Sequence, residues 1–246
     1  MKPTCFIPFI SELEKVDIPT QMNNPFESNI PEIAQLASTE LQAFLIKNQS
    51  LWRHNFGTDL EIQIAAKGKM FGVLVVRAEN GDLGYLATFS GKILDEPHPT
   101  HFVPSLFDVS TNDSFITKGM LELKGISEVM KSASLDEEYE QLKMQRKNRS
   151  YELQHQLFAS YVFLNSKGES KSLVKIFADY GSKIPPAGAG ECAAPKLLHY
   201  AYQHQLTPIA IAEFWWGKSN KSASRKHLAF YPACHDKCVP ILGFMV

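Results

Sequence analysis

The sequence predicts an α/β fold in which a small central sheet is flanked by helices, with the elements in the order α-β-β-(helical insertion)-α-β-α. Three observations support this order. A stretch of helical periodicity precedes a β-hairpin, a long charged stretch without helix breakers follows, and a glycine-rich loop then leads into a helix, a β-like run and a second helix start. The 246 residues, 44% of them hydrophobic, are enough to bury one full core.

The first half of the chain predicts a helix and a hairpin. Residues 29–45 carry apolar side chains at helical spacing, and Asn29 stands in the N-cap position three residues before a glutamate. The runs 70–76 and 83–89 are β-like, and Asn-Gly lies in the segment between them, which is typical of a hairpin turn. Three prolines within residues 92–112 indicate an irregular connection.

A charged helical insertion follows the hairpin. Residues 135–164 contain no proline or glycine, and their second half places apolar side chains three and four residues apart. This predicts one long helix, half solvated and half docked, that ends at Gly168, with a short helix over 170–180. We therefore divide the chain into an N-terminal part of the α/β domain with the hairpin (1–126), the helical insertion (127–182) and a C-terminal part of the α/β domain with the cysteine cluster (183–246).

Three of the four cysteines lie in two short segments of this C-terminal part. Cys192 follows the glycine-rich loop and opens a predicted helix, while Cys234 and Cys238 open the next helix after the β-like run 208–216. In a reducing compartment, clustered cysteines are ligands or nucleophiles rather than disulfides. The sequence therefore predicts a metal pocket at the edge of the sheet, with Zn²⁺ as the candidate ion. The alternative is that the thiols are small buried hydrophobic groups.

The carboxylate of Glu191 stands directly before the first of these thiols in the sequence. A carboxylate within hydrogen-bond reach of a reacting group could carry protons there. Its alternative role is to place a favourable negative charge at the start of a helix.

Composition and charge limit the partners and the compartment. The formal net charge of -1 argues against a generally polyanion-binding surface, so any nucleic-acid site must be local. No stretch approaches the roughly 18 apolar residues that a membrane-spanning helix needs, and the first residues do not form a secretory signal. We expect a cytoplasmic protein without a membrane partner. The apolar run 239–246 ends without a polar cap, which predicts that the native protein continues past Val246.

Two groups of basic residues could hold phosphates. One lies on the long helix and the other in the loop 217–226, and a tryptophan beside this loop could stack on a base. The alternatives are a solvated helix face paired with glutamates and tryptophans that belong to the core. The candidate RNA-binding residues are Lys143, Arg146, Lys147, Arg149, Lys218, Lys221, Arg225, Lys226 and Trp216.

The order of elements resembles the fold of the zinc-dependent cytidine deaminases. In that family a helix opens with a His or Cys ligand, a catalytic Glu follows two residues later, and the next strand leads to a Pro-Cys-x-x-Cys turn. The resemblance implies Cys192 as the first ligand, Cys234 and Cys238 as the pair, and Glu191 as the proton carrier. This chain departs from the pattern in two ways. Its Glu precedes the first ligand, and three residues rather than two separate the paired thiols.

A more extensive resemblance is to the long N-terminal region of certain bacterial RNA pseudouridine synthases of the RluA family. It rests on the segments Arg149–Phe158, Phe163–Leu173, Pro185–Leu198, Ala212–Gly217 and Phe230–Cys234. The resemblance implies an accessory domain that helps bind or position structured RNA, rRNA or tRNA, with the catalytic domain in the same longer chain.

The family's His-Arg-Leu-Asp segment, which carries its catalytic Asp, does not occur in this sequence. The chain alone is therefore not expected to isomerise uridine. The second hypothesis is a zinc-dependent deaminase-like enzyme that acts on a base or nucleotide. The third is a purely structural metal site that holds the two helix starts together.

Overall fold

The computed structural model describes residues 2–49, 54–58, 67–93, 98–107, 114–133, 135–182, 184–220 and 222–246. Its main sheet has the strand order β1-β3-β2-β6, and every neighbouring pair is antiparallel. The strands are β1 (Ile7–Pro8), β2 (Lys69–Arg77), β3 (Leu83–Phe89) and β6 (Thr207–Trp216), and a separate small sheet pairs β4 (Val162–Leu164) with β5 (Ser170–Ser172). The helices are α1 (Glu32–Lys47), α2 (Phe115–Ser132), α3 (Asp136–Ser160), α4 (Leu173–Asp179), α5 (Ala193–Gln203) and α6 (His235–Met245).

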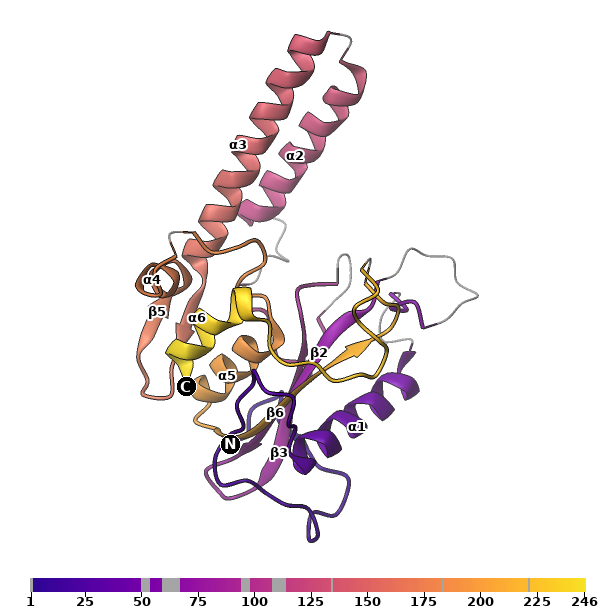
Figure 1. The fold of residues 1–246 in the computed structure, drawn as a ribbon, viewed down its shortest axis with the longest axis vertical. Helices are drawn as coiled ribbons and strands as arrows, with labels where there is room; N and C mark the ends of the chain where they lie inside the picture. Colours follow the sequence, from indigo (N-terminus) through magenta and orange to yellow (C-terminus); the bar gives the residue numbers. More distant parts are fainter. Residues whose placement is uncertain are drawn as a thin grey trace.

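This architecture confirms the predicted α/β class, with a small sheet flanked by helices (Figure 1). The helix α1 packs on β2 and β6 from one side, while α5 packs on β2, β3 and β6 and is itself covered by α6. Each face of the sheet therefore has its own hydrophobic core. The strand β2 is buried from Phe71 to Val76 because both of its faces are covered, which explains its continuous apolar sequence.

The N-terminal segment covers part of the outer edge of β6. The Asn23 side chain donates to the carbonyl of Ile211 at 3.2 Å and accepts from its N–H at 2.8 Å. The N–H of Ala233, which precedes α6, donates to the carbonyl of Pro25 at 2.8 Å. An exposed strand edge invites pairing with other chains. The amide of Asn23 imitates one residue of a neighbouring strand and blocks part of that edge.

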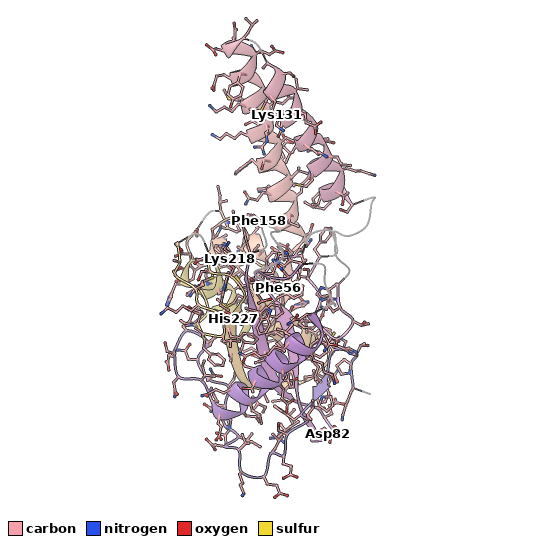
Figure 2. The ribbon with its side chains drawn as sticks, turned by 90° about the vertical axis from the view of Figure 1, so that its right-hand side faces the viewer. Phe56, Asp82, Lys131, Phe158, Lys218 and His227 are labelled. Carbon is pink, nitrogen blue, oxygen red and sulfur yellow. The ribbon has the colours of Figure 1, made fainter. Side chains whose placement is uncertain are left out.

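The helices α2 and α3 form a hairpin, here called the arm, that projects from the α/β body (Figure 1). Figure 2 shows Lys131 towards the far end of the arm and Phe158 near its base. Only Gly119 and Leu123 of α2 are buried, and both lie on the side that faces α3. The arm is therefore held by a narrow contact between two largely solvated helices.

The sequence prediction of the helices needs three corrections. The helix α2 was not expected, and the proposed boundary at residue 126 falls inside it. The long helix ends at Ser160, because the chain then turns into the hairpin β4–β5, where Gly168 occupies the turn with a φ of 80°. At the start of α1, the N-cap is Pro31 with no side-chain hydrogen bond, rather than Asn29.

The predicted elements around the cysteines are confirmed. The expected helix from Cys192 is α5, the β-like run is β6, and the helix that opens near Cys234 is α6. Among the helices of the described residues, none combines the length and the apolar character needed to cross a bilayer.

We predict opposite effects for two glycine-to-alanine substitutions in α2. A Cβ at Gly119 would lie 2.3 Å from Leu153 Cδ2, whereas a Cβ at Gly125 would meet no atom within 4 Å. Gly119→Ala should lower the free energy of unfolding by about 1–3 kcal/mol, because it overpacks the arm. Gly125→Ala should raise it by up to about 1 kcal/mol through helix propensity. Urea denaturation followed by circular dichroism would check both, and equal effects would contradict this packing.

Candidate metal centre

The starts of two helices bring the three thiols together. Cys192 is the N-cap of α5 and Cys234 is the N-cap of α6. Cys238 lies one turn into α6, where its N–H donates to the carbonyl of Cys234 at 3.1 Å. On a helix, residues four apart share one face. With three residues between them, Cys234 and Cys238 therefore point their thiols to the same side of α6.

The distances between the sulfur atoms suit a single ion. The Sγ atoms of Cys192 and Cys234 are 3.8 Å apart, and those of Cys234 and Cys238 are 3.4 Å apart. All three lie within 4.8 Å of one another. Tetrahedral coordination with metal–sulfur bonds of about 2.3 Å requires sulfur atoms roughly 3.8 Å apart. The described residues thus form a group of thiols that could hold a metal ion.

The thiols influence one another's ionisation. The neighbouring thiols Cys192 and Cys238 donate hydrogen bonds that lower the pKa of Cys234. Hydrogen bonding to Cys234 raises the pKa of Cys192, and hydrogen bonding to Cys192 raises that of Cys238. Such a group ionises stepwise as a unit. A bound cation would favour the thiolate form of all three side chains, so metal binding should release protons.

Cys5 lies apart from this group. It is buried, and its Sγ donates to the carbonyl of Phe102 at 3.4 Å. His235 follows Cys234 directly, but it is exposed and its ring lies against Phe26. Neither residue belongs to the three-thiol group found among the described residues.

The carboxylate of Glu191 is directed at Tyr161. The Tyr161 hydroxyl donates a short hydrogen bond to Oε1 of Glu191, while Oε2 is buried and has no hydrogen-bond partner among the described residues. The backbone of Glu191 is also fixed, because its carbonyl accepts from the N–H of Gly91 at 2.8 Å. Glu191 is not part of the compact group of thiols. Its role as a proton carrier stays a prediction.

Two lysines that the sequence analysis missed lie beside Glu191. Lys196 is only 1% exposed and donates to the carbonyl of Phe89 at 2.5 Å, and Lys69 donates to the carbonyl of Ser90 at 3.2 Å. Burial lowers the pKa of Lys196 to about 8, against the opposing influence of Glu191 and Cys192. Burial also lowers the pKa of Lys69, again opposed by Glu191. The signal for Lys196 in the sequence was a lysine in the first turn of a helix that is otherwise mostly apolar.

A second carboxylate that the sequence analysis missed is that of Glu213 in β6. This residue is 8% exposed, and its Oε1 accepts from the N–H of Ala194 at 2.9 Å. The N-cap Cys192 makes no side-chain capping bond, so Glu213 supplies the cap of α5 from the neighbouring strand. Burial raises the pKa of Glu213 to about 7. Its signal was a single carboxylate within the apolar run 208–216.

A small pocket adjoins Glu213. Its volume is about 10 Å³, close to the lower limit for one water molecule. The walls include Ala194 of α5 and Ala233, which directly precedes Cys234, together with Asn23 and Tyr231. A base does not fit into this pocket in the present conformation.

The basic residues on the arm are largely engaged with neighbours. Lys143 pairs with Glu140, Arg149 pairs with Glu122 and Glu152, and Arg146 donates to Ser127 at 2.7 Å. Lys147 is exposed. These contacts are those of a solvated helix face with acidic partners.

The basic residues of the loop after β6 are more available for contact with phosphates than those on the arm. Lys218 and Lys226 are exposed, and Arg225 lies with its Cζ 4.1 Å from the ring centre of Tyr231. Lys221 lies outside the described residues. Trp216 does not reach the surface, since it is 5% exposed and its ring packs edge-on against His227. A base could not stack on Trp216 unless the core opened, and Trp215 is the partly exposed ring of the pair.

We predict that Lys196→Met removes a rise in the free energy of unfolding between pH 8 and pH 10.5. Burial sets the pKa of folded Lys196 at about 8, below the ordinary value of 10.5, so its charged form destabilises the fold below about pH 8. This penalty disappears as the pH rises from 8 to 10.5. In the metal-free protein, the wild type should therefore gain on the order of 3 kcal/mol relative to the variant between pH 7 and pH 10.5. Denaturant titrations at several pH values with a chelator present would measure this, and a constant difference would contradict it.

Comparisons with protein-family models, with curated proteins and with solved structures find no match to this chain. The group of three thiols at the starts of α5 and α6 is the feature of the described residues that points most directly to a function.

Proposed function

We propose that the chain is a zinc-binding accessory domain of an RNA pseudouridine synthase of the RluA type, which helps to bind or position structured RNA and does not itself isomerise uridine. The observation that carries this proposal is the convergence of three thiols within 4.8 Å of one another. The chain lacks the His-Arg-Leu-Asp segment of that family, so the isomerisation would belong to a separate catalytic domain.

The segments that carry the resemblance also build the centre. Pro185–Leu198 contributes Cys192, and Phe230–Cys234 contributes Cys234, whose Sγ lies 3.8 Å from that of Cys192. Ala212–Gly217 covers the end of β6, the strand that lies between α5 and α6 in the chain. A resemblance caused by composition alone would not favour residues that meet at one point of the fold. This agreement supports a shared use of the region in the family.

Zinc is the ion that the donor set favours. Thiolate ligands in tetrahedral geometry select zinc over harder cations such as Mg²⁺ and Ca²⁺. Among the described residues, His, Cys, Asp and Glu side chains supply three ligand atoms to this group, which leaves one position for water or a partner. A zinc ion with such an open position acts as a Lewis acid that can activate water.

The loop after β6 is the better candidate for RNA contact. Among the described residues, Lys218 and Lys226 take part in no ion pair, whereas Lys143 and Arg149 on the arm already have acidic partners. Figure 2 shows Lys218 and His227 on the body of the molecule, away from Lys131 on the arm. Exposed and unpaired cations are free to neutralise phosphates.

A second candidate function is a zinc-dependent deaminase-like enzyme that acts on a base or nucleotide. The observation that favours it is that the thiols lie at the starts of two helices joined by a strand, as in the family pattern. The residue two positions after the first ligand is Ala194, however, so the helix itself does not provide the catalytic carboxylate of that pattern.

The proposed zinc centre predicts that substitution of one ligand abolishes zinc binding. The wild type, reconstituted with Zn²⁺ and dialysed against a weak chelator, should retain about one ion per chain by atomic emission. Cys234→Ser should lose it, because a neutral hydroxyl is a poor ligand. Cys5→Ser is the matched control and should retain the ion, since Cys5 lies outside the group. Retention of zinc by Cys234→Ser would exclude this centre.

The RNA proposal predicts binding that falls steeply with salt. Fluorescence anisotropy with structured rRNA and tRNA fragments should show weaker binding for the triple variant Lys218→Ala, Arg225→Ala, Lys226→Ala. Its salt slope should fall by about one unit for each lost phosphate contact. A matched triple substitution of Lys143, Arg146 and Lys147 on the arm should change binding much less. Absent or salt-insensitive binding by the wild type would contradict an RNA-positioning role.

A further inference from the structure

Two ammonium groups meet at the end of β3, where the strand leads into Gly91. The Nζ of Lys196 donates to the carbonyl of Phe89 at 2.5 Å. The Nζ of Lys69 donates to the carbonyl of the next residue, Ser90, at 3.2 Å. Both ammonium groups also lie beside the Phe89 ring, with 5.5 Å and 6.0 Å between the Nζ atoms and the ring centre. The fold therefore brings two like charges, one from α5 and one from the start of β2, to a single strand end.

These two ammonium groups have no acidic side chain within ion-pair distance among the described residues. Lys196 is 1% exposed, and Lys69 is partly buried. Burial is the main cause that lowers the pKa of each side chain, and the charge of Lys69 lowers that of Lys196 further, while Glu191 opposes both shifts. Lysines are almost never fully buried unless they are paired with an opposite charge. Two of them at one strand end indicate that an anion belongs there.

The space in front of Gly91 is open among the described residues. A Cβ built at Gly91 would meet one heavy atom within 4 Å beyond its chain neighbours, the Nζ of Lys69 at 3.8 Å. The backbone of Gly91 has a φ of 64°, which is the left-handed region that favours glycine. An oxygen atom of a ligand at this point could accept a hydrogen bond from Lys69 without displacing a side chain.

The end of the glycine-rich loop that precedes Cys192 contacts Gly91. The carbonyl of Glu191 accepts from the N–H of Gly91 at 2.8 Å. The Tyr161 hydroxyl donates to Oε1 of Glu191, whereas Oε2 is buried and has no partner among the described residues. Buried polar atoms in native proteins are normally hydrogen-bonded. The unpartnered oxygen therefore indicates a missing donor, which a water molecule or a hydroxyl group of the ligand can supply.

This corner of the fold adjoins the loop after β6 that we propose to contact RNA. Lys69 lies opposite Trp216, the last residue of β6, in the register of the sheet. Gly68, the residue before Lys69, donates its N–H to the carbonyl of Lys218 at 3.1 Å. The exposed cations of that loop and the two ammonium groups therefore lie at the same end of the sheet.

We propose that this corner is a subsite for one phosphate group, in which Lys69 donates to a phosphate oxygen in front of Gly91 and the buried Lys196 supplies a second positive charge. Phosphate suits the site better than a carboxylate, because an ammonium group is a compact point charge, whereas the planar guanidinium of Arg matches a carboxylate best. The subsite deepens the RNA-positioning role proposed above and rests on it for the source of the phosphate, the RNA backbone. A free phosphate compound is the other source of the same group.

Inorganic phosphate alone is the first probe, added to the full chain at constant ionic strength while amide NMR spectra are recorded. The N–H signal of Gly91 should shift in a saturable way in the wild type. Lys69→Gln should weaken this binding by about 10-fold or more, which is the effect of one charge-assisted hydrogen bond. Lys131→Gln is the matched control, since it removes the same charge towards the far end of the arm (Figure 2), and it should bind phosphate as the wild type does.

A second variant tests the same space without removing a lysine. Gly91→Asp places a carboxylate next to the Nζ of Lys69, and Asp is one of the residues that tolerate the left-handed backbone of this position. This internal anion should abolish the response to phosphate while circular dichroism shows that the fold is kept. Gly168→Asp is the control, because Gly168 also has a positive φ, of 80°, and lies in the turn between β4 and β5. It should leave the response unchanged.

Fluorescence anisotropy with structured RNA fragments identifies the source of the phosphate. Lys69→Gln should weaken RNA binding and lower its salt slope by about one unit, and Lys131→Gln should change neither. If phosphate binding depends on Lys69 but RNA binding does not, or if the wild type binds no RNA, the subsite stands with a free phosphate compound as its ligand and the RNA source fails. A Gly91 signal that does not respond to phosphate, or a response that Lys69→Gln leaves unchanged, overturns the subsite itself.

Discussion

The close approach of α5 to the central strand β2 is the constraint on which the site depends. Gly72 permits it, because a Cβ there would lie 2.8 Å from the Cβ of Ala193 and 3.2 Å from Leu197 Cδ1. This contact fixes the start of α5 over the sheet and hence the position of Cys192. Since β6 pairs with β2 in a set register and leads on to α6, the same sheet fixes Cys234. The thiols meet because a packed core positions both helix starts, and not because a local loop folds around an ion.

Buried charge is the second organising feature of this region. In the free protein, Lys196 is almost fully buried and its pKa is depressed by burial, which opposes folding at neutral pH. Three thiolates around a divalent ion carry a single net negative charge. The negative charge of Cys192 already acts to raise the pKa of Lys196. Binding of a metal ion would therefore give the buried ammonium group of Lys196 a nearby negative charge that compensates its own charge.

Much of the fold could be predicted from the sequence because its signals are local. The Asn-Gly turn gave the hairpin β2–β3, and the positions of Cys192 and Cys234 marked the helix starts. The helix α2 was missed because it contains Gly119 and Gly125 and leaves Met120 and Leu121 exposed, so its apolar periodicity is weak. The burial of Trp216 and the partners of Lys196 and Glu213 depend on tertiary packing, which no local pattern reports.

The two carboxylates near the start of α5 differ in their surroundings. Glu191 is bound by the Tyr161 hydroxyl, and its charge opposes the lowering of the pKa of Lys69 and Lys196 by burial. Glu213 has one backbone donor, and burial holds its pKa at about 7, where either protonation state is accessible. The residue adjacent in sequence to the first thiol is thus engaged by Tyr161, while the sheet brings a second buried carboxylate to the N-terminus of α5.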